Sequence, residues 1–307
     1  MRAVCCTGYG GPEVLVCREV PTPVPGKNEV LIKIRAFPVN TPDRRIRGLN
    51  VPFPKAQWIL KLLLRASFGF FRPRNPILGN YFAGQIEAVG TNVDAARIGE
   101  EVFGYSGGRR GAYAEYLCLP TNTVMAPKPA NLTFEQSAAI PYGGGNALYF
   151  LHRAGGVKAG QSVLIYGASG AIGAAAVQLA KHYGAHVTGV CGGANMPMVK
   201  ALGADVVIDY AKENFVDGEG CYDLVFDAVG KLSAANCRQK LAPDGTFVTV
   251  MSGNSSVHQE DFVLLKKLAE EGKLKPVIGR YYSLEATAAA HECADGEHTN
   301  GVVVVTV

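Results

Sequence analysis

The glycine-rich turn GASGAIG is the segment whose residue types and spacing point most directly to chemistry. It follows the apolar run Val163–Ile165, which predicts a buried strand, and precedes Ala174–Lys181, which predicts a helix. In such a unit the glycines permit a tight turn, close approach of backbone to a pyrophosphate, and close packing of helix on strand. The N–H groups at the helix start favour the phosphate charge. We therefore assign the whole turn to dinucleotide binding: Gly167, Ala168, Ser169, Gly170, Ala171, Ile172 and Gly173.

The choice of dinucleotide depends on the loop after the second strand of this unit. An NAD site usually has Asp or Glu there, about 20 residues past the glycine turn, to hold the ribose 2′-hydroxyl. Here the sequence is CGGAN, and no acid follows before Asp205. An acid would repel a 2′-phosphate, so its absence allows NADP. We expect NADPH rather than NADH, with contacts from this loop and the nearest cation: Cys191, Gly192, Asn195 and Lys200.

Strand and helix patterns alternate through the same region. Four further strands are predicted, at His186–Val190, Ala204–Asp209, Asp223–Val229 and Thr246–Val250. Helical segments are predicted between them, at Met196–Leu202 and Leu232–Leu241. This alternation implies βαβ units and a parallel sheet. The fold class is therefore α/β, with a Rossmann doubly wound parallel sheet over residues 125–279.

The N-terminal part has a different pattern. Short strands are predicted between glycine turns, at Glu29–Phe37, Phe82–Val89, Glu101–Phe103 and Ala112–Leu119. One more strand, Gly301–Val307, ends the chain. We expect residues 1–124 to form a β-domain that is completed by about residues 280–307.

Composition limits the classes of partner. A net charge of +4 over 307 residues is too small to indicate nucleic acid binding. The eight cysteines contain no C-x-x-C pair, which suggests reduced thiols in a cytoplasmic protein. The opening sequence lacks the pattern of a signal peptide. The apolar segment Trp58–Phe71 is too short to cross a bilayer, and it predicts an amphipathic helix that covers a cleft or weakly contacts a membrane surface.

The order of segments along nearly the whole chain resembles the medium-chain dehydrogenase/reductase superfamily, and within it the zinc-independent quinone oxidoreductase-like branch. The segments that carry the resemblance are GGPEVL, VNTPDRRIRG, NPILGNYFAGQIEAVG, GAYAEYLCLP, YGASGAIGAAAVQLAK, LGADVVIDY, YDLVFDAVG and EGKLKPVIGRYYSLEATAAAH. The resemblance implies a GroES-like β-domain and a Rossmann domain with the active site between them. It also implies hydride transfer from NADPH to a quinone or enone.

The resemblance also suggests site residues. Asn40 and Asp43 line the cleft, and Tyr113 is a further donor, although Asn40-Thr41-Pro42-Asp43 is also a plain turn sequence. Tyr210 lies beside the adenosine, or simply ends a strand. We also assign residues of the loops after the fourth and fifth strands to the cofactor: Val229, Gly230, Met251 and Ser252.

Zinc is not expected. The zinc alcohol dehydrogenases of the superfamily have a cysteine near Asn40 and a His-Glu pair where this chain has Asn80-Tyr81. They also have a four-cysteine lobe that is missing here. Zinc requires Cys, His or carboxylate ligands. Without a metal, catalysis consists mainly of positioning and exclusion of water around the cofactor.

Three departures from the family pattern bear on activity. Tyr81 stands where an acid is usual, and Gly143-Gly144-Gly145-Asn146 replaces a Leu-Thr-Ala step. Asn146 takes the place of the threonine beside the nicotinamide, and the glycines are expected to weaken the start of this helix. Only Met251–Glu260 separate the fifth strand from a helix predicted at Asp261–Gly272. We expect a shortened sheet and a more open nicotinamide pocket, and the homodimer of the family is in doubt. Val302 also replaces a lysine of the family's tail.

Three functions remain open from the sequence. The first is an NADPH-dependent oxidoreductase that acts on a small apolar electrophilic substrate, a quinone or an enone. The second is an NADPH-binding sensor with little catalysis. The third is a zinc-free alcohol or aldehyde reductase. Turnover of conjugated against isolated carbonyls distinguishes the first from the other two.

Overall fold

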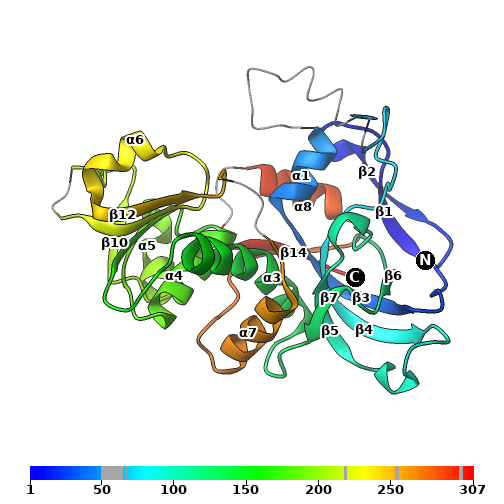
Figure 1. Cartoon of the computed structure of the whole chain (residues 1–307). Helices are drawn as coiled ribbons and strands as arrows, with labels where there is room; N and C mark the ends of the chain where they lie inside the picture. Colours follow the sequence, from blue (N-terminus) through cyan, green and yellow to red (C-terminus); the bar gives the residue numbers. More distant parts are fainter. Residues whose placement is uncertain (50–64, 67, 218–219, 253–255, 297–299) are drawn as a thin grey trace. The chain divides into compact units, whose positions relative to one another are not determined.

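The computed structural model describes residues 1–49, 65–66, 68–217, 220–252, 256–296 and 300–307. The chain divides into two units, the first formed by Met1–Ala139 with Ile278–Val307 and the second by Ile140–Val277 (Figure 1). Most of the Trp58–Phe71 segment lies outside the described residues. No helix among those residues is long and apolar enough to cross a membrane.

The first unit is built on antiparallel strands. Its seven-stranded sheet has the order β13-β14-β3-β4-β5-β7, with β6 paired to β3, and β1 and β2 form a separate pair. Its elements within the described residues include β1 (Arg2–Cys6), β2 (Leu15–Glu19), β3 (Glu29–Val39), α1 (Thr41–Gly48), β4 (Tyr81–Val89), β5 (Glu101–Tyr105), β6 (Tyr116–Pro120), β7 (Val124–Pro127), the start of α3 (Phe134–Leu148), β13 (Ile278–Ser283), α8 (Thr287–Asp295) and β14 (Val302–Thr306).

Strand pairing explains which segments belong to this unit. β7 pairs with β5, so the chain stays in the first unit beyond residue 124, and the boundary falls within α3. β14 pairs antiparallel with β3, so the end of the chain returns to the same unit. β3 has three neighbours, β14, β4 and β6, and its side chains are buried along most of its length. It therefore forms the centre of the core.

The second unit is a five-stranded parallel sheet in the order β10-β9-β8-β11-β12. Its elements are the rest of α3, a π-helical turn (Tyr149–Ala154), β8 (Ser162–Tyr166), α4 (Ala171–His182), β9 (His186–Cys191), α5 (Met196–Ala201), β10 (Val206–Asp209), β11 (Tyr222–Asp227), α6 (Ala234–Cys237), β12 (Leu241–Thr249) and α7 (Gln259–Glu270). This sheet and the β-domain confirm the predicted fold class. No sixth strand follows β12 within the described residues.

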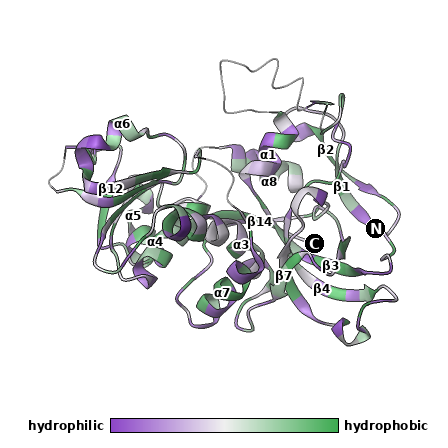
Figure 2. Ribbon diagram, in the orientation of Figure 1, coloured by the Kyte–Doolittle hydropathy of each residue, from purple (hydrophilic) through white to green (hydrophobic). Residues whose placement is uncertain are grey.

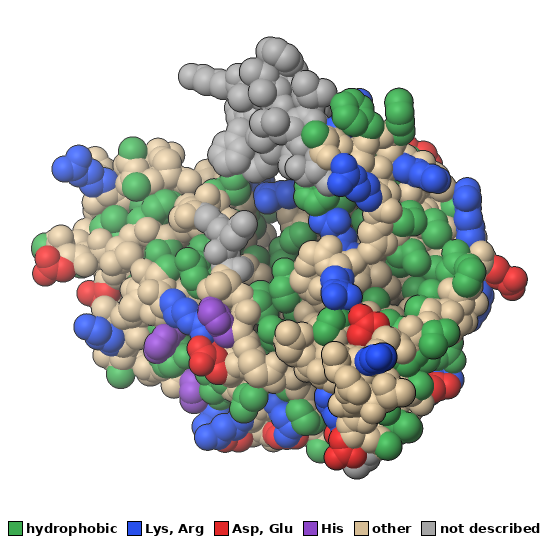
Figure 3. Space-filling view, turned by 45° about the vertical axis from the view of Figure 1, so that its right-hand side comes forward, with side chains coloured by type: hydrophobic (Ala, Val, Ile, Leu, Met, Phe, Trp, Pro, Cys, Tyr) green, Lys and Arg blue, Asp and Glu red, His purple; other side chains and the backbone are tan. Residues whose placement is uncertain are grey.

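Helices of the second unit bury their apolar faces against the sheet and against one another. α4 buries every residue from Gly173 to Ala180, because small side chains allow it to lie close to the strands. α7 is both purple and green in Figure 2, as expected of a helix with one buried face that includes Phe262, Leu265 and Leu268. On the face shown in Figure 3, cationic and anionic side chains are interspersed.

Four local predictions need correction. The helix predicted at Leu232–Leu241 is reduced to α6 and a 3-10 turn, because β12 already begins at Leu241, which pairs with Tyr222. The strand predicted at Ala112–Leu119 is limited to β6, since the N–H groups of Ala112 and Tyr113 bond the carbonyls of the 78–79 segment instead.

The other two corrections concern the predicted turn at Asn40 and the predicted effect of the glycines of α3. Asn40 caps a helix, α1, which the sequence reading missed despite its signal of a capping Asn followed by Pro at the second helical position. α3 begins at Phe134, so the glycines at 143–145 lie in its second half and do not weaken its start. Gly143 is needed for packing, because a Cβ there would lie 2.2 Å from the Ala171 carbonyl oxygen.

Candidate functional site

The glycine turn lies at the carboxyl end of β8, between its neighbours β9 and β11. The chain runs from β8 outward to β9 and β10 on one side, and then to β11 and β12 on the other. This change of direction creates a topological switch point, where open α/β sheets bind ligands. The turn is therefore placed where a dinucleotide pyrophosphate can meet the start of α4.

The backbone of the turn requires glycine at its two ends. Gly167 has φ of 80°, a left-handed conformation that glycine adopts without strain. A Cβ on Gly173 would lie 2.1 Å from the Gly167 carbonyl oxygen. Gly170 is the N-cap of α4 and supplies no side-chain acceptor. The first N–H groups of α4 have no partner within their own helix, so they are available to an anion.

Two neighbouring loops meet the turn. A Cβ on Gly167 would lie 2.6 Å from Val229 Cγ1, and one on Gly230 would lie 2.7 Å from Met251 Cγ, so the loops after β11 and β12 are in contact. Asp227 organises the first loop, because its buried carboxylate accepts from the N–H groups of Val229 and Gly230 at 3.1 and 2.9 Å. Ser252 closes the second loop through its hydroxyl, which bonds the Thr249 carbonyl oxygen at 2.8 Å.

The loop after β9 also lies against the turn. The Asn195 amide donates to the Ser169 hydroxyl at 3.3 Å. Cys191 pairs with Asp209 across β9 and β10, and the Tyr210 hydroxyl lies 3.3 Å from where a Gly192 Cβ would stand. These predicted residues therefore lie close to the glycine turn.

Lys200 is not brought to this loop. It lies near the end of α5, and its ammonium donates to the Asp205 carbonyl at 2.5 Å. Asp209 is an acid near this loop that was not predicted from the sequence as part of the cofactor site. A Cβ on Gly193 would lie 2.5 Å from Asp209 Oδ2, so this carboxylate borders the loop from the adjacent strand. Asp209 is buried and accepts from the Ala211 N–H at 3.1 Å.

Asn146 lies on α3, one turn beyond the contact of Gly143 with the start of α4. Its amide donates to the Tyr142 carbonyl at 2.7 Å, four residues earlier in the same helix. A side chain three residues after Gly143 shares the helix face of that contact. Asn146 therefore lies on the face of α3 that approaches the glycine turn.

In the first unit, Asn40 and Asp43 lie at the start of α1. Asn40 Oδ1 accepts from the Asp43 N–H at 3.3 Å, which caps the helix. The Asn40 amide nitrogen donates to Asn80 Oδ1 at 3.1 Å. Both ends of the Asn40 side chain are thus engaged, and the residue is only 3% exposed. Asn80, which follows the 76–79 segment, is half-buried.

Asp43 is an isolated buried carboxyl. Its Oδ1 accepts from the Gly79 N–H at 3.2 Å, whereas Oδ2 has no hydrogen-bond partner among the described residues. Burial raises the pKa of Asp43 to about 7, although the Gly79 N–H, the Tyr113 hydroxyl and the Arg110 charge act to lower it. The Tyr113 hydroxyl acts on this carboxyl without reaching full hydrogen-bonding geometry to Oδ2. Asp43 can therefore change its protonation state near neutral pH.

Tyr113 belongs to a buried chain of polar groups that ends at α8. Its hydroxyl lies 3.0 Å from His291 Nε2, and Arg47 donates to His291 Nδ1 at 2.8 Å. Because a guanidinium only donates, Nδ1 must be the acceptor and Nε2 carries the proton. Nε2 then donates to the Tyr113 oxygen, which leaves the Tyr113 O–H directed to another acceptor. Burial and the charge of Arg47 lower the pKa of His291 to about 3, which keeps the imidazole neutral.

The arrangement changes the expected role of Tyr113. Its side chain is completely buried, and its ring stacks on Phe37 with centroids 4.4 Å apart. Tyr113 therefore belongs to the core and acts on Asp43 from inside the unit. The sequence reading also missed Arg47 and His291, which complete the chain. Neither residue has a local signal, because Arg47 stands among other arginines in DRRIRG and His291 lies 244 residues later in the chain.

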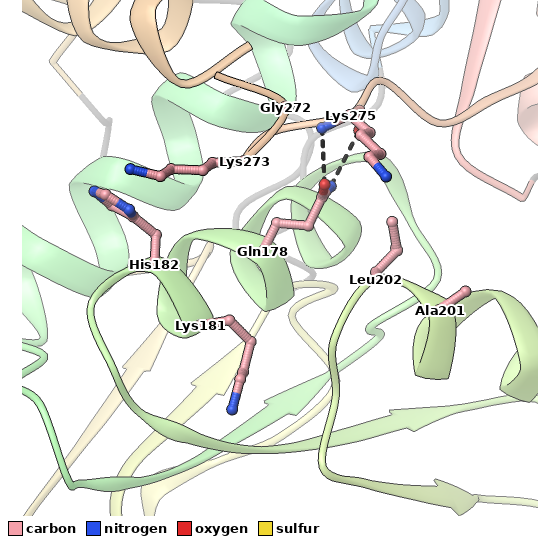
Figure 4. Close-up of a pocket in the computed structure, with 8 residues that line it drawn as sticks. All are labelled: Gln178, Lys181, His182, Ala201, Leu202, Gly272, Lys273 and Lys275. Atoms are coloured by element: carbon pink, nitrogen blue, oxygen red, sulfur yellow. Dashed lines mark hydrogen bonds between the residues drawn. The ribbon is translucent and has the colours of Figure 1, made fainter. Parts of the chain in front are cut away.

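A separate pocket of about 520 Å³ lies in the second unit, at the C-terminal end of α4 (Figure 4). The glycine turn is at the opposite end of this 12-residue helix, about 18 Å away. Lys181 in this pocket is paired with Asp205 at 2.8 Å, and Gln178 bonds the backbone of Lys275. The pocket is therefore distinct from the dinucleotide turn.

Two family models match the chain. Residues 26–130 match the alcohol dehydrogenase GroES-like domain, and residues 171–292 match the zinc-binding dehydrogenase domain. The human quinone oxidoreductase is 34% identical over 95% of this chain and 93% of its own length. The chloroplastic NADPH-dependent alkenal/one oxidoreductase of Arabidopsis thaliana is 31% identical over 99% of this chain and 79% of its own.

A solved structure agrees. The quinone oxidoreductase from Coxiella burnetii matches with a TM-score of 0.86 and 30% identity, covering 100% of this chain and 99% of that one. The resemblance found in the sequence is thereby confirmed, and with it the GroES-like nature of the β-domain. This chain belongs to the medium-chain dehydrogenase/reductase superfamily, in its quinone oxidoreductase-like branch, and is an oxidoreductase that uses a pyridine nucleotide.

Proposed function

We propose that this protein is an NADPH-dependent, zinc-independent reductase of conjugated carbonyl compounds, quinones or enones. The observation that carries the proposal is the glycine turn at the switch point of the sheet, where Gly173 leaves only 2.1 Å between a Cβ and the Gly167 carbonyl. This contact lets the start of α4 pack against the end of β8, which places the first N–H groups of the helix where a pyrophosphate can meet them. Relatives named for quinone and alkenal/one turnover support the substrate class.

The cofactor residues fit a dinucleotide. The N–H groups at the start of α4 would hold the pyrophosphate, and Asn195 with Ser169 would border the adenosine side. NADPH is favoured because β9 ends at Cys191 and the Gly192–Asn195 loop that follows contains no acid. Asp209 accepts the Ala211 N–H through Oδ1 while Oδ2 borders the loop, and its effect on the choice of cofactor is tested by the comparison with NADH below. When bound, the reduced nicotinamide supplies the hydride.

The residues present do not fit a catalytic zinc. Asn40 and Asn80 bond one another through their amides, and amides are not zinc ligands of choice. The described residues contain no group of three His, Cys, Asp or Glu side chains arranged for a metal. The matched zinc-binding dehydrogenase domain therefore indicates shared ancestry of the Rossmann unit, and no step of the proposed reaction passes through a metal.

The buried polar cluster of the first unit, which contains Asp43, supports the supply of the proton that this reduction consumes. Reduction of a conjugated carbonyl consumes one proton besides the hydride, and a group with a pKa near 7 both holds and releases a proton at neutral pH. Asp43 has a pKa raised to about 7. Its burial makes it a positioning and proton-holding group behind Asn40 and Asn80. Quinones and enones accept hydride without Lewis-acid activation, which suits a cluster that holds no metal ligands.

The other two functions left open by the sequence are less favoured. Relatives that cover nearly the whole chain are named for turnover of quinones and of alkenals and alkenones, which supports catalysis rather than a sensor with little activity. The same names support conjugated substrates over simple alcohols and aldehydes.

The test is oxidation of NADPH, followed by its absorbance, with phenanthrenequinone and with a simple enone. A saturated ketone of the same skeleton is the control substrate, and NADH is run in parallel. We expect turnover of the quinone and the enone, weaker with NADH, and none of the saturated ketone. Reduction of the saturated ketone, or binding of NADPH without turnover of either conjugated substrate, would overturn the proposal.

A further inference from the structure

Arg110 occupies a position beside the polar cluster of the first unit. The loop that carries it runs along the 76–80 segment, where Gly111 N bonds the Leu78 carbonyl at 3.2 Å and Ala112 N bonds the Gly79 carbonyl at 3.1 Å. Gly79 in turn holds the Asp43 carboxylate through its own N–H. The backbone next to Arg110 is therefore fixed against the segment that binds Asp43.

The backbone of Arg110 is strained. Its φ is 56° and its ψ is −149°, a region that is essentially restricted to glycine. Such a conformation is unfavourable for a residue that has a Cβ. Glycines occupy positions 107, 108 and 111, so the loop uses glycine freely at other sites. Strain of this kind is concentrated at ligand-binding positions, where the side chain is worth more than the cost.

The N–H donors of the Arg110 guanidinium have no acceptor among the described residues. The side chain is half-buried, with the guanidinium 4.8 Å from the ring centroid of Phe68. It makes no hydrogen bond or ion pair with any described residue. Arg109 differs, because it is exposed and pairs with Glu29 at 3.2 Å. A guanidinium has five N–H donors in a planar fork, so Arg110 retains a set that matches two oxygens of one anion.

The surroundings leave this charge only partly compensated. The nearby ionisable groups that interact electrostatically with Arg110 are Asp43, Tyr105 and Tyr9, and none of them makes a hydrogen bond with it. Asp43 is fully buried behind Gly79, and Tyr105 is a half-buried phenol. A partly desolvated cation without a bonded anion is unfavourable, and a carboxylate from outside would relieve this.

We propose that Arg110 binds a carboxylate of the substrate, so that this enzyme prefers conjugated carbonyls that carry an acidic group. The inference rests on the proposed reductase function and names its substrate class. Arg110 is then a specificity residue, with its guanidinium over the Phe68 ring and its fork meeting both oxygens of the carboxylate. The conjugated alkene of the same molecule is the part that is reduced.

The experiment uses two enones of one skeleton, acetylacrylate and its methyl ester, which differ by the charge. Because the ester is the more electrophilic alkene, the readout is the acid-to-ester ratio of kcat/KM in each variant. We expect R110Q to lower this ratio about 10- to 100-fold, the range for a charge-assisted hydrogen bond. R109Q is the matched control and should keep the wild-type ratio. An equal ratio in wild type and R110Q would overturn the proposal.

Two further variants separate binding from folding. R110G gives the strained position the residue that adopts it freely, so its Tm should equal or exceed that of wild type while the preference for the acid is lost. R110K keeps the charge but not the fork, and should give an intermediate ratio. A lower Tm in R110G, or a full acid preference in it, would contradict the assigned role of the side chain.

Binding without turnover distinguishes failure of this inference from failure of the proposed function. Levulinate has the same length and carboxylate but no conjugated alkene, and its affinity can be measured by titration calorimetry. We expect levulinate to bind wild type and R109Q, and to bind R110Q about 10-fold or more weakly. Levulinate binding through Arg110 with no reduction of acetylacrylate would reject the reductase and retain the carboxylate site. Equal binding by all three proteins would reject the carboxylate site.

Discussion

The two units build their candidate sites by opposite means. In the second unit the site is mostly backbone, a turn in which Gly167 has φ of 80° and Gly173 has no room for a Cβ. In the first unit the site consists of side chains that the core encloses, with Asp43, Tyr113 and His291 all at most 1% exposed. One site is formed by leaving side chains out, and the other by burying polar ones.

The two sites should therefore be sensitive to different kinds of substitution. A backbone site tolerates changes in charge nearby but not an added methyl group, because bulk blocks the approach of the ligand. A buried polar site tolerates little loss of any partner, because each remaining charge is left without solvent or a counter-ion. Substitutions should therefore affect stability mainly in the first unit and cofactor affinity mainly in the second.

The largest effect is expected from removing Arg47. Its guanidinium bonds His291 at 2.8 Å and Asp295 at 2.6 Å and is only 3% exposed. R47A removes the donor to His291 Nδ1, one of the two cations that pair with Asp295, and a buried side chain, and should lower the free energy of unfolding by about 3–5 kcal/mol. R44A is the control, since the more exposed Arg44 pairs with Asp295 at 3.3 Å and donates to the Ala294 carbonyl, contacts that should contribute about 1 kcal/mol. Urea unfolding measures both, and equal losses would contradict the comparison.

The next effect is a pH dependence set by two buried groups that act in opposite directions. The pKa of Asp43 is about 7, above the value near 4 in an unfolded chain, so its stabilising contribution is present below pH of about 4 and is lost as pH rises through about 7. The pKa of His291 is about 3, below the unfolded value of about 6.5. Its contribution is therefore present above about 6.5 and is lost as pH falls towards about 3.

D43N separates these two slopes. Asparagine does not ionise, so the falling contribution of Asp43 disappears and the rising contribution of His291 is exposed. The free energy of unfolding of D43N minus that of wild type should therefore increase between pH of about 4 and about 7, by at most about 4 kcal/mol. Urea unfolding over a pH series measures the difference. Parallel profiles for D43N and wild type would show that Asp43 does not titrate in this range.

The sequence predicted the second unit better than the first, for a physical reason. The turn GASGAIG lies within one strand–turn–helix unit, so all its residues are neighbours in the chain. Asp209 escaped notice because it comes from a third strand, which only pairing with β9 places beside Gly193. Local patterns therefore predict contacts within one unit of supersecondary structure but not contacts between strands.

The first unit shows why the rest could not be predicted. Its site depends on contacts between residues far apart in sequence, such as Tyr113 with His291, 178 residues away. The direction of that hydrogen bond follows only once Arg47 is known to donate to the other nitrogen. The strained backbone of Arg110 likewise could not be predicted from the sequence GGRRG. The three glycines of that segment adopt a positive φ more readily than Arg110 does.

The smallest of the three effects concerns the glycine turn, and two glycines of one turn make the test sharp. A Cβ on Gly173 would lie 2.1 Å from the Gly167 carbonyl oxygen, whereas one on Gly170 would lie 3.5 Å from the same atom, an ordinary contact. Overpacking of this severity costs about 1–3 kcal/mol. G173A should therefore lower the Tm of the cofactor-free protein and weaken NADPH binding up to about 100-fold, while G170A should leave that Tm unchanged.

Calorimetric titration with NADPH measures both affinities, and Tm without cofactor shows whether the unit still folds. Gly170 has φ of −77°, which alanine adopts without strain, so G170A differs from G173A in the space for a methyl group rather than in backbone freedom. A fall in Tm in G170A as large as in G173A would show that the turn needs flexibility, not closeness. The second unit would then depend on mobility, and its contrast with the rigid polar chain of the first would have a different cause.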